Sequence, residues 1–403
     1  MARFPAGGLR RNGGGGSPIH LRRHNLERVL ELITDREGPF TRGELIEATG
    51  LSAPTVGSLV THLMRKGIVL NLGAGPSRGG RRPAHMRFNT RHGFVAGIDL
   101  GPTHTRLAVA DLRGEPLARR QIETPAHLAP LELLGRIARA GKELVREVAV
   151  PQGRLLAVCA GAPGVVDRDQ GTVTAAAPNL HGWTGVSMAD NLQRAFGAPV
   201  VVENDVNLAI LGERWRGAAR GHDTCAFLSF GTGVGAGIVV DGELRRGHHS
   251  LAGEIGFMCM GPEHVETEFG SSGCLETLTG LQTLDARWRG TGNLERWVEE
   301  LFEGAAAGDA SAADVARDVA RLVTMAVANL SLVLDPSLIV MGGALFTRGA
   351  PLLEELRRRT NRILPRPVEI ALSELHEEAP LWGSLLVASA SARERLRQSL
   401  WEE

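Results

Sequence analysis

Three features of exported or membrane proteins are missing from this 403-residue chain. Its best apolar run, Ala226 to Val240, is interrupted by glycines and falls short of 18 residues, so we expect no membrane span. The first 20 residues lack an apolar signal-peptide core and contain glycine and arginine instead. Only four cysteines are present, which indicates buried thiols or metal ligands rather than disulfides. The sequence therefore predicts a cytoplasmic protein.

The chain also lacks net charge, but the zero is the sum of two opposite parts. Residues 1–92 contain 15 Lys and Arg against 6 Asp and Glu, whereas residues 93–403 contain 30 against 39. Only the first part is suited to bind a polyanion such as nucleic acid. Hydrophobic residues make up 43% of the chain, which is enough to bury the cores of two or three domains.

The basic part opens with a pattern of two short helices. Apolar residues from Leu26 to Ile33 recur at helical spacing and predict a first helix that Gly38 stops. Thr41 and Glu44 form a Thr-x-x-Glu capping box, which predicts a second helix ending at Gly50.

A third helix follows the Ala-Thr-Gly-Leu-Ser turn. Ser52 can cap it, and apolar residues from Val56 to Leu63 form its buried stripe. Helix, turn and helix in this order are the helix-turn-helix arrangement, whose last helix enters the major groove of DNA. The predicted DNA contacts on this helix are Ser52, Thr55, Ser58 and His62.

Two strand-like runs, residues 68–72 and 85–89, flank an arginine-rich loop from Gly73 to Pro83. This pattern predicts a two-stranded wing whose cationic tip adds Arg78, Arg81 and Arg82 to the DNA contacts. Taken alone, an arginine-rich loop is usually a solvated surface, and three short helices can be a plain bundle. Their succession, together with the local positive charge, favours DNA binding.

From Phe94 the pattern changes to that of an α/β domain. Three strands follow each other at 94–101, 105–112 and 115–122, and then helical and strand-like stretches alternate as far as Asp205. A second such succession begins at Cys225. Hairpin-linked strands followed by alternating helices and strands predict a mixed sheet.

Eight short motifs in this part resemble, in content and in order, those of the ROK family of repressors and sugar kinases. They are Asp99–Thr103, Gly161–Asp167, Pro178–Leu180, Glu203–Asn207, Gly231–Gly237, Ala252–Gly256, Gly273–Glu276 and Met341–Gly343. Together with the winged helix, the likeness spans residues 24 to about 390 and is to the family's repressor branch. It implies an actin-like (ribonuclease H-like), two-lobed α/β sugar-kinase fold behind an α+β winged helix-turn-helix domain, assembled as a homodimer or tetramer.

These observations predict four segments. Residues 1–22 form a flexible tail, 23–92 the winged helix, 93–215 the first actin-like lobe and 216–403 the second lobe. The C-terminal helix is expected to return to the first lobe.

Asn204 and Asp205 directly follow an apolar strand, at the end where α/β sheets place their ligands. A carboxylate there can accept a hydrogen bond from a sugar hydroxyl, or its proton during phosphoryl transfer. In isolation such a pair more often forms an Asx turn after a strand. The resemblance implies that Asp205 matches the kinases' catalytic base, here vestigial, and that the sugar contacts are Asn179, Asn204, Asp205, Glu254 and Glu276.

The first phosphate loop departs from the kinase pattern Asp-x-Gly-Gly-Thr-Lys. Pro102 replaces the second glycine and His104 replaces the lysine, which removes a backbone N–H and a fixed positive charge. Other glycine turns could still cradle phosphate or approach an adenosine, but we interpret them as turns inherited by a non-enzyme. The vestigial nucleotide positions are Asp99, Gly101, Thr103, Gly231, Thr232, Gly233, Gly342 and Gly343.

The family's structural zinc would require four ligands at positions that are Phe257, Thr267, Phe269 and Cys274 in this chain. Only the cysteine can bind zinc, so we expect no metal and no cofactor. An irregular substitute set, Cys259, His264, His248 and His249, remains as an alternative. Because the residue at position 257 also touches the sugar in the family, Phe257 should weaken binding of a simple hexose.

The sequence therefore predicts a sugar-responsive transcriptional regulator, a repressor, that binds operator DNA as a dimer. One alternative is an ATP-dependent sugar kinase with an appended DNA-binding head. The other is a DNA-binding protein without a small-molecule effector, which draws support only from Phe257 and the lost zinc ligands.

Overall fold

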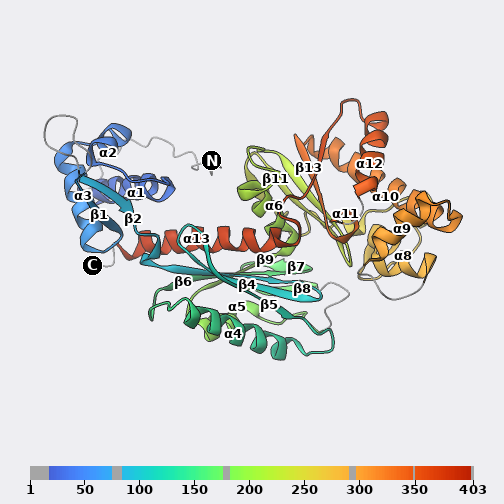
Figure 1. Ribbon diagram of the computed structural model, residues 1–403, viewed down its shortest axis with the longest axis horizontal. Coiled ribbons are helices and arrows are strands. Elements are labelled where there is room, and N and C mark those ends of the chain that lie inside the picture. Colours follow the sequence, from blue (N-terminus) through green and yellow to red (C-terminus); the bar gives the residue numbers. More distant parts are fainter. Residues whose placement is uncertain (1–17, 75–83, 176–181, 290–295, 348–349, 401–403) are drawn as a thin grey trace.

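The computed structural model describes residues 18–74, 84–175, 182–289, 296–347 and 350–400. A small basic head is followed by two larger lobes, and a long C-terminal helix runs from the junction of the lobes back to the head (Figure 1). Within the described residues, no helix is long and apolar enough to cross a membrane.

The head is a winged helix. Its elements are α1 (Pro18–Asp35), α2 (Arg42–Thr49), α3 (Ala53–Arg65), β1 (Val69–Ala74) and β2 (Ala84–Phe88). β1 and β2 pair antiparallel and form the wing. Of the predicted contacts at its tip, Arg78, Arg81 and Arg82 lie outside the described residues.

Local hydrogen bonds explain where these helices begin and end. Both halves of the capping box of Thr41 and Glu44 are present, and Gly50 ends α2 with a φ of 68°. Ser52 caps α3 by accepting a hydrogen bond from the backbone N–H of Thr55 at 3.4 Å. Helix α1 begins at Pro18, inside the segment 1–22 that was predicted to be a flexible tail. The glycine run ends before this residue, and proline suits the first turn of a helix.

The first lobe is built on a five-stranded sheet of order β5-β4-β3-β6-β9. Its strands are β3 (Phe94–Leu100), β4 (His104–Asp111), β5 (Pro116–Glu123), β6 (Leu155–Ala162) and β9 (Val200–Asn204). β3, β4 and β5 are antiparallel, whereas β6 and β9 continue the sheet in parallel. The remaining elements are η1 (Thr90–His92), α4 (Pro130–Glu147), β7 (Val165–Asp167), β8 (Thr172–Ala175) and α5 (Met188–Phe196).

The second lobe repeats this plan with a sheet of order β12-β11-β10-β13-β14. Its strands are β10 (Cys225–Phe230), β11 (Val234–Val240), β12 (Glu243–Arg245), β13 (Leu338–Gly342) and β14 (Glu369–Leu372). Its helices are η2 (Ile255–Phe257), η3 (Pro262–His264), α7 (Gly273–Thr279), α8 (Leu281–Trp288), α9 (Trp297–Ala306), α10 (Ala310–Leu334), α11 (Ala344–Thr347), α12 (Ala350–Ile363) and η4 (His376–Glu378).

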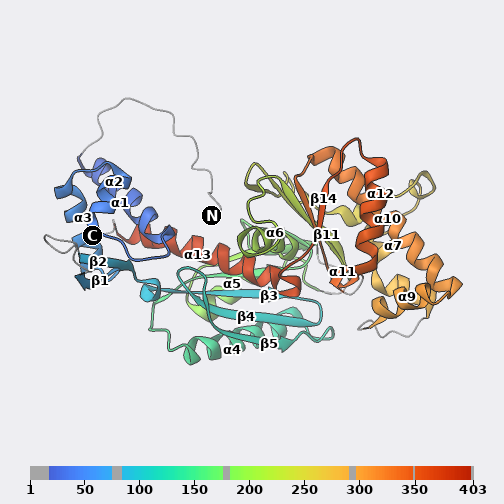
Figure 2. The same cartoon turned by 45° about the horizontal axis from the view of Figure 1, so that its top comes forward.

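Two helices, α6 (Asp205–Arg216) and α13 (Ala379–Ser399), lie between the sheets (Figure 2). Helix α6 is buried on two sides: Leu208 packs with the first lobe and α13, whereas Ile210 packs against β10 and β11. The two helices touch backbone to backbone. A Cβ on Gly383 would lie 1.9 Å from the carbonyl oxygen of Leu208, and one on Gly212 would lie 2.3 Å from that of Ala379.

The far end of α13 reaches the winged helix. Leu396 and Leu400 belong to the same buried cluster as the apolar residues of α1 and α3. Arg393 forms an ion pair with Asp35 at 3.3 Å, and Arg113 donates hydrogen bonds to two backbone carbonyls just after α1. The head and the first lobe therefore share one hydrophobic core.

The predicted fold class is confirmed: an α+β winged helix precedes a two-lobed α/β body, and each lobe is built on a mixed sheet.

The helix contact generates a stability prediction. Replacing Gly383 by alanine should lower the free energy of unfolding by about 2 kcal/mol or more, since the new methyl group collides with backbone rather than with a movable side chain. Gly135 is the matched control, because it lies in helix α4 with nothing within 4 Å of an added Cβ. Gly135→Ala should be neutral or stabilise the protein by about 0.5–1 kcal/mol. Urea unfolding measures both; equal effects would contradict the contact.

Candidate ligand cleft between the lobes

Asn204 and Asp205 lie where β9 ends and α6 begins. The side-chain oxygen of Asn204 accepts a hydrogen bond from the backbone N–H of Asn207 at 3.0 Å, and its amide group donates to the carbonyl of Gly164 at 3.0 Å. Asn204 is thus the N-cap of α6. Asp205 accepts from the N–H of Val206 at 2.9 Å through one carboxylate oxygen.

The second lobe contributes two carboxylates. Glu254 directly precedes η2, and Glu276 lies in α7. One oxygen of Glu276 accepts a hydrogen bond from the backbone N–H of Val234 at 2.7 Å. Burial raises the pKa of Glu254, and the neighbouring charge of Glu276 raises it further. The pKa of Glu276 is also raised by burial.

The residues that follow Asp205 and precede Glu254 lie close to the same point of β11: a Cβ on Gly235 would lie 3.4 Å from the side chain of Val206 and 4.0 Å from the carbonyl oxygen of Gly253. Burial raises the pKa of Asp205 to about 7, and the charges of Asp99 and Glu254 act in the same direction. Burial likewise raises the pKa of Asp99 to about 6, against the opposing charge of Arg106. Asp99, Asp205, Glu254 and Glu276 therefore form a chain of interacting carboxylates where the two lobes meet, and we call this region the candidate cleft. Carboxylates placed in this way are acceptors for a ligand rich in hydroxyl groups.

The turn between β3 and β4 does not have the features of a phosphate-binding loop. The backbone N–H of Gly101 donates to the carbonyl of His104 at 3.1 Å, and Pro102 has no N–H to offer. The hydroxyl of Thr103 lies 3.0 Å from the ring nitrogen Nδ1 of His104. The backbone N–H of Gly101 is therefore directed into the hairpin itself.

The glycines of the other two turns are explained by hydrogen bonds and close contacts inside the fold. The N–H of Gly231 donates to the carbonyl of Gly233 at 3.0 Å, which closes the turn that contains Thr232. Gly342 leaves no room for a side chain, since a Cβ would lie 2.2 Å from the ring of Phe227. Gly343 has a φ of 79°, and a Cβ there would lie 2.3 Å from the carbonyl oxygen of Phe230. These contacts support the interpretation as structural turns.

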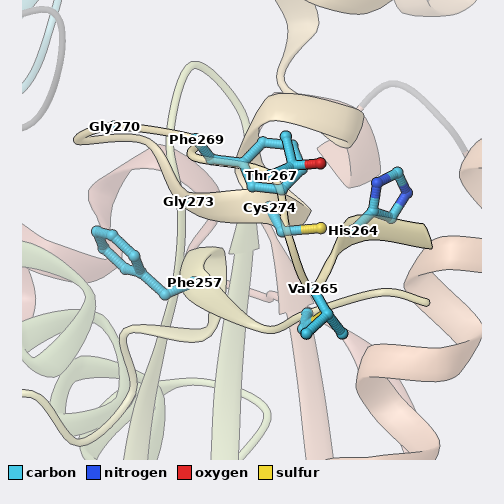
Figure 3. A pocket seen from close by; sticks show the side chains of 9 residues that line it. Phe257, His264, Val265, Thr267, Phe269, Gly270, Gly273 and Cys274 are labelled. Carbon is cyan, nitrogen blue, oxygen red and sulfur yellow. The ribbon is translucent and has the colours of Figure 1, made fainter. Parts of the chain in front are cut away.

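The positions of the family's zinc ligands line an aromatic hollow of about 340 Å³. His264 packs edge-on against Phe269 with 5.6 Å between ring centroids, while Phe257 points away from Cys274 (Figure 3). Over the described part of the chain, no three His, Cys, Asp or Glu side chains are grouped so that they could hold a metal ion. His248 and His249 pack edge-on against each other and do not line this hollow.

The predicted contacts on α3 differ in accessibility. Ser58 is exposed, whereas Thr55 and His62 are half-buried. The hydroxyls of Ser52 and Thr55 lie 2.8 Å apart and share a hydrogen bond. Asn179, a predicted sugar contact, lies outside the described residues.

Three site residues were not recognised in the sequence. Arg106 lies 3.5 Å from Asp99 and also pairs with Glu377, next to α13. Arg246, whose side chain is 30% exposed, forms an ion pair with the buried Glu203, two residues before Asp205. An acidic residue at the end of an apolar strand was a signal for Glu203, but nothing local indicated its partner.

A winged helix joined to a two-lobed body with an acidic cleft defines a DNA-binding protein on a sugar-kinase scaffold. The model of the ROK family matches residues 95–390, and the chain belongs to this family. Its winged helix places it in the transcriptional-regulator branch.

Similar proteins come from both branches of the family. The xylose repressor of Caldicellulosiruptor bescii is 28% identical, over 86% of this chain and 90% of that protein. The crystal structure of a ROK family transcriptional regulator, a homolog of the E. coli MLC protein, superposes with a TM-score of 0.76 at 23% identity, covering 94% of this chain and 99% of that one. A ROK glucokinase of Streptomyces griseus, solved with glucose and AMPPNP, is 29% identical with a TM-score of 0.62 and covers 74% and 100%.

The raised pKa values generate a pH prediction. Asp99 and Asp205 bind protons more tightly when folded than when unfolded, so their contribution to stability is complete below about pH 4 and is lost as the pH rises through 6 and 7. The ligand-free protein with Asp205→Asn should therefore gain stability over the wild type as the pH rises from 5 to 8, by at most about 1.4 kcal/mol per pH unit.

Thermal unfolding across this range measures the gain. Asp309 caps α10, and its pKa is lowered by a backbone hydrogen bond from Ala312 and one from the indole of Trp288. Asp309→Asn is the control and should not show the gain. A constant difference between wild type and Asp205→Asn would contradict the burial of this carboxylate.

Proposed function

We propose that this protein is a cytoplasmic transcriptional repressor that binds operator DNA through its winged helix and a sugar or sugar derivative in the cleft between the lobes. The proposal rests on a difference between the sugar side and the phosphate side of the cleft: the first keeps its hydrogen-bond acceptors, and the second has lost donors. Four carboxylates of both lobes gather in the cleft, whereas Pro102 and His104 occupy the turn that would hold phosphate. The likeness to xylose repressors supports the same conclusion.

The sugar-kinase alternative rests on Asp205. A carboxylate with a pKa near 7 can act as a general base at neutral pH. Phosphoryl transfer also requires donors for the phosphates, and in the β3–β4 turn Pro102 has no N–H while that of Gly101 already donates to His104. We therefore propose that the protein is not an enzyme. The proposal of no effector at all loses support, because the cleft keeps its hydroxyl acceptors even though Phe257 replaces a polar residue.

A sugar can regulate DNA binding only if it binds one arrangement of the protein better than another. We propose that the protein works as a homodimer or tetramer, since a helix-turn-helix dimer matches the two half-sites of an inverted repeat. A sugar that changes the angle between the lobes would change the spacing of the two heads. The shared core of head and first lobe would transmit this change.

The first functional prediction is specific, salt-sensitive binding of the full chain to an inverted-repeat operator in a gel shift. Ser58→Glu places a negative charge on the exposed face of α3 and should weaken binding at least about tenfold. Ser311→Glu, an exposed position on α10 in the far lobe, is the control and should not change affinity. Equal affinity for operator and competitor DNA would contradict the proposal.

The second functional prediction concerns the effector. Calorimetry with neutral, amino and phosphorylated sugars, with and without operator DNA, should find a ligand whose affinity falls at least about tenfold in Asp205→Ala and Glu276→Ala, because buried acceptors select for hydroxyl groups. Glu243→Gln, an exposed change on β12, is the control. The same preparations should show no sugar-dependent ATP turnover. Turnover that disappears in Asp205→Asn would favour the kinase instead.

The third functional prediction is that the purified protein holds no stoichiometric zinc, because Phe257, Thr267 and Phe269 stand at ligand positions. Elemental analysis after dialysis measures the metal content. About one zinc per chain would contradict the expectation and would direct attention to Cys259, Cys274 and His264.

A further inference from the structure

Glu203 is a buried carboxylate that the sugar site does not use directly. It lies in β9, immediately before Asn204 and Asp205, and its side chain is only 4% exposed. Its partner, Arg246, follows β12 in the sheet of the other lobe. The Nε and Nη2 atoms of Arg246 both lie 2.7 Å from the Oε2 atom of Glu203.

The second oxygen of Glu203 fixes the start of α6. Oε1 accepts hydrogen bonds from the backbone N–H of Asn204 at 3.1 Å and from the side-chain amide of Asn207 at 3.0 Å. These two residues enclose Asp205 in the first turn of the helix. One carboxylate therefore holds the turn that presents Asp205 and, with its other oxygen, reaches across to the second lobe.

Arg246 is anchored to the loop that presents Glu254. Its carbonyl accepts a hydrogen bond from the N–H of Ala252 at 3.0 Å, which closes the segment from 246 to 252. The carbonyl of Gly253 then accepts from the N–H of Ala236 in β11 at 2.7 Å. The position of Glu254 thus depends on a loop tied to β11 at one point and to Glu203 at another.

We propose that the Glu203–Arg246 ion pair is an interlobe clamp that sets the distance between Asp205 and Glu254, and so positions both sides of the cleft on one hydroxyl-rich ligand. The inference rests on the proposed function, since it concerns the same cleft. Glu203 and Arg246 are positioning residues. The forked guanidinium fixes direction as well as distance, which a single flexible ammonium would not do.

Hydrogen exchange of the full chain without any ligand tests the clamp itself. In Arg246→Met, the backbone amides of residues 246–256 should exchange about tenfold faster than in the wild type, while those of β10 and β13 should stay unchanged. Arg357→Met is the matched control. Arg357 also places two nitrogens, Nε and Nη2, on one oxygen, the carbonyl of Ile370 at 3.0 and 2.6 Å, but far from the cleft. Unchanged exchange of residues 246–256 in Arg246→Met would overturn the proposal.

Calorimetry with D-xylose and D-glucose tests the consequence for binding. Glu203→Gln and Arg246→Met should each raise the Kd at least about tenfold, and the double variant should be no worse than Arg246→Met alone, since one interaction is lost in each. Arg246→Lys should recover part of the affinity. Loss in Glu203→Gln without loss in Arg246→Met would show that Glu203 acts only within α6 and would overturn the clamp.

The two experiments, hydrogen exchange and calorimetry, test this inference and the proposed function separately. If neither sugar binds the wild type, the choice of effector fails, while the exchange measurement still decides whether the clamp exists. If the sugars bind the wild type and all variants with the same Kd, the proposed sugar site keeps its support and the proposed clamp is wrong.

Discussion

The contact between α6 and α13 is the constraint on which the rest of the structure depends. Two helices pack backbone to backbone because Gly212 and Gly383 carry no side chain, and each lobe then packs its sheet against this pair. Helix α6 begins with Asp205 in the cleft, and α13 ends in the core of the winged helix. Interiors packed at this density are not freely deformable, so a displacement at one end of the pair must be accommodated along it.

The sequence predicted what depends on neighbours along the chain. The capping box at Thr41, the cap at Ser52 and the three hairpin-linked strands follow from local hydrogen bonds and from the period of apolar residues, and the resemblance predicted the two-lobed fold. The pairing of Arg246 with Glu203 could not be read, because the two residues are separated by 43 positions and meet only when the lobes pack. The start of α1 at Pro18 was missed because the preceding glycines indicated a longer tail.

The cleft contains several carboxylates close to one another and a cation, Arg106, that pairs with one of them. Among its described residues, Arg106 is a cation whose charge favours ionisation of Asp99 and so opposes the effect of burial on its pKa. Burial raises the pKa of Asp205 and that of Glu254; the charges of Asp99 and Glu254 add to the effect at Asp205, and the charge of Glu276 adds to it at Glu254. Such a site favours neutral, polyhydroxylated ligands over anionic ones, since a phosphate group would add to the repulsion. In the aromatic hollow at the family's zinc positions, His264 packs edge-on against Phe269.

The β3–β4 turn and the start of α6 differ in how much of the surrounding structure a substitution disturbs. Pro102 and His104 lie at a hairpin tip, where a change alters only the tip. Asn204 caps a buried helix, so a change there disturbs the core. On this scaffold, a substitution at the β3–β4 tip disturbs fewer contacts than one at the start of α6, where the residue that caps the helix is also a proposed sugar contact. The fold therefore restricts the sequence more strongly on the sugar side of the cleft than at the hairpin on its phosphate side.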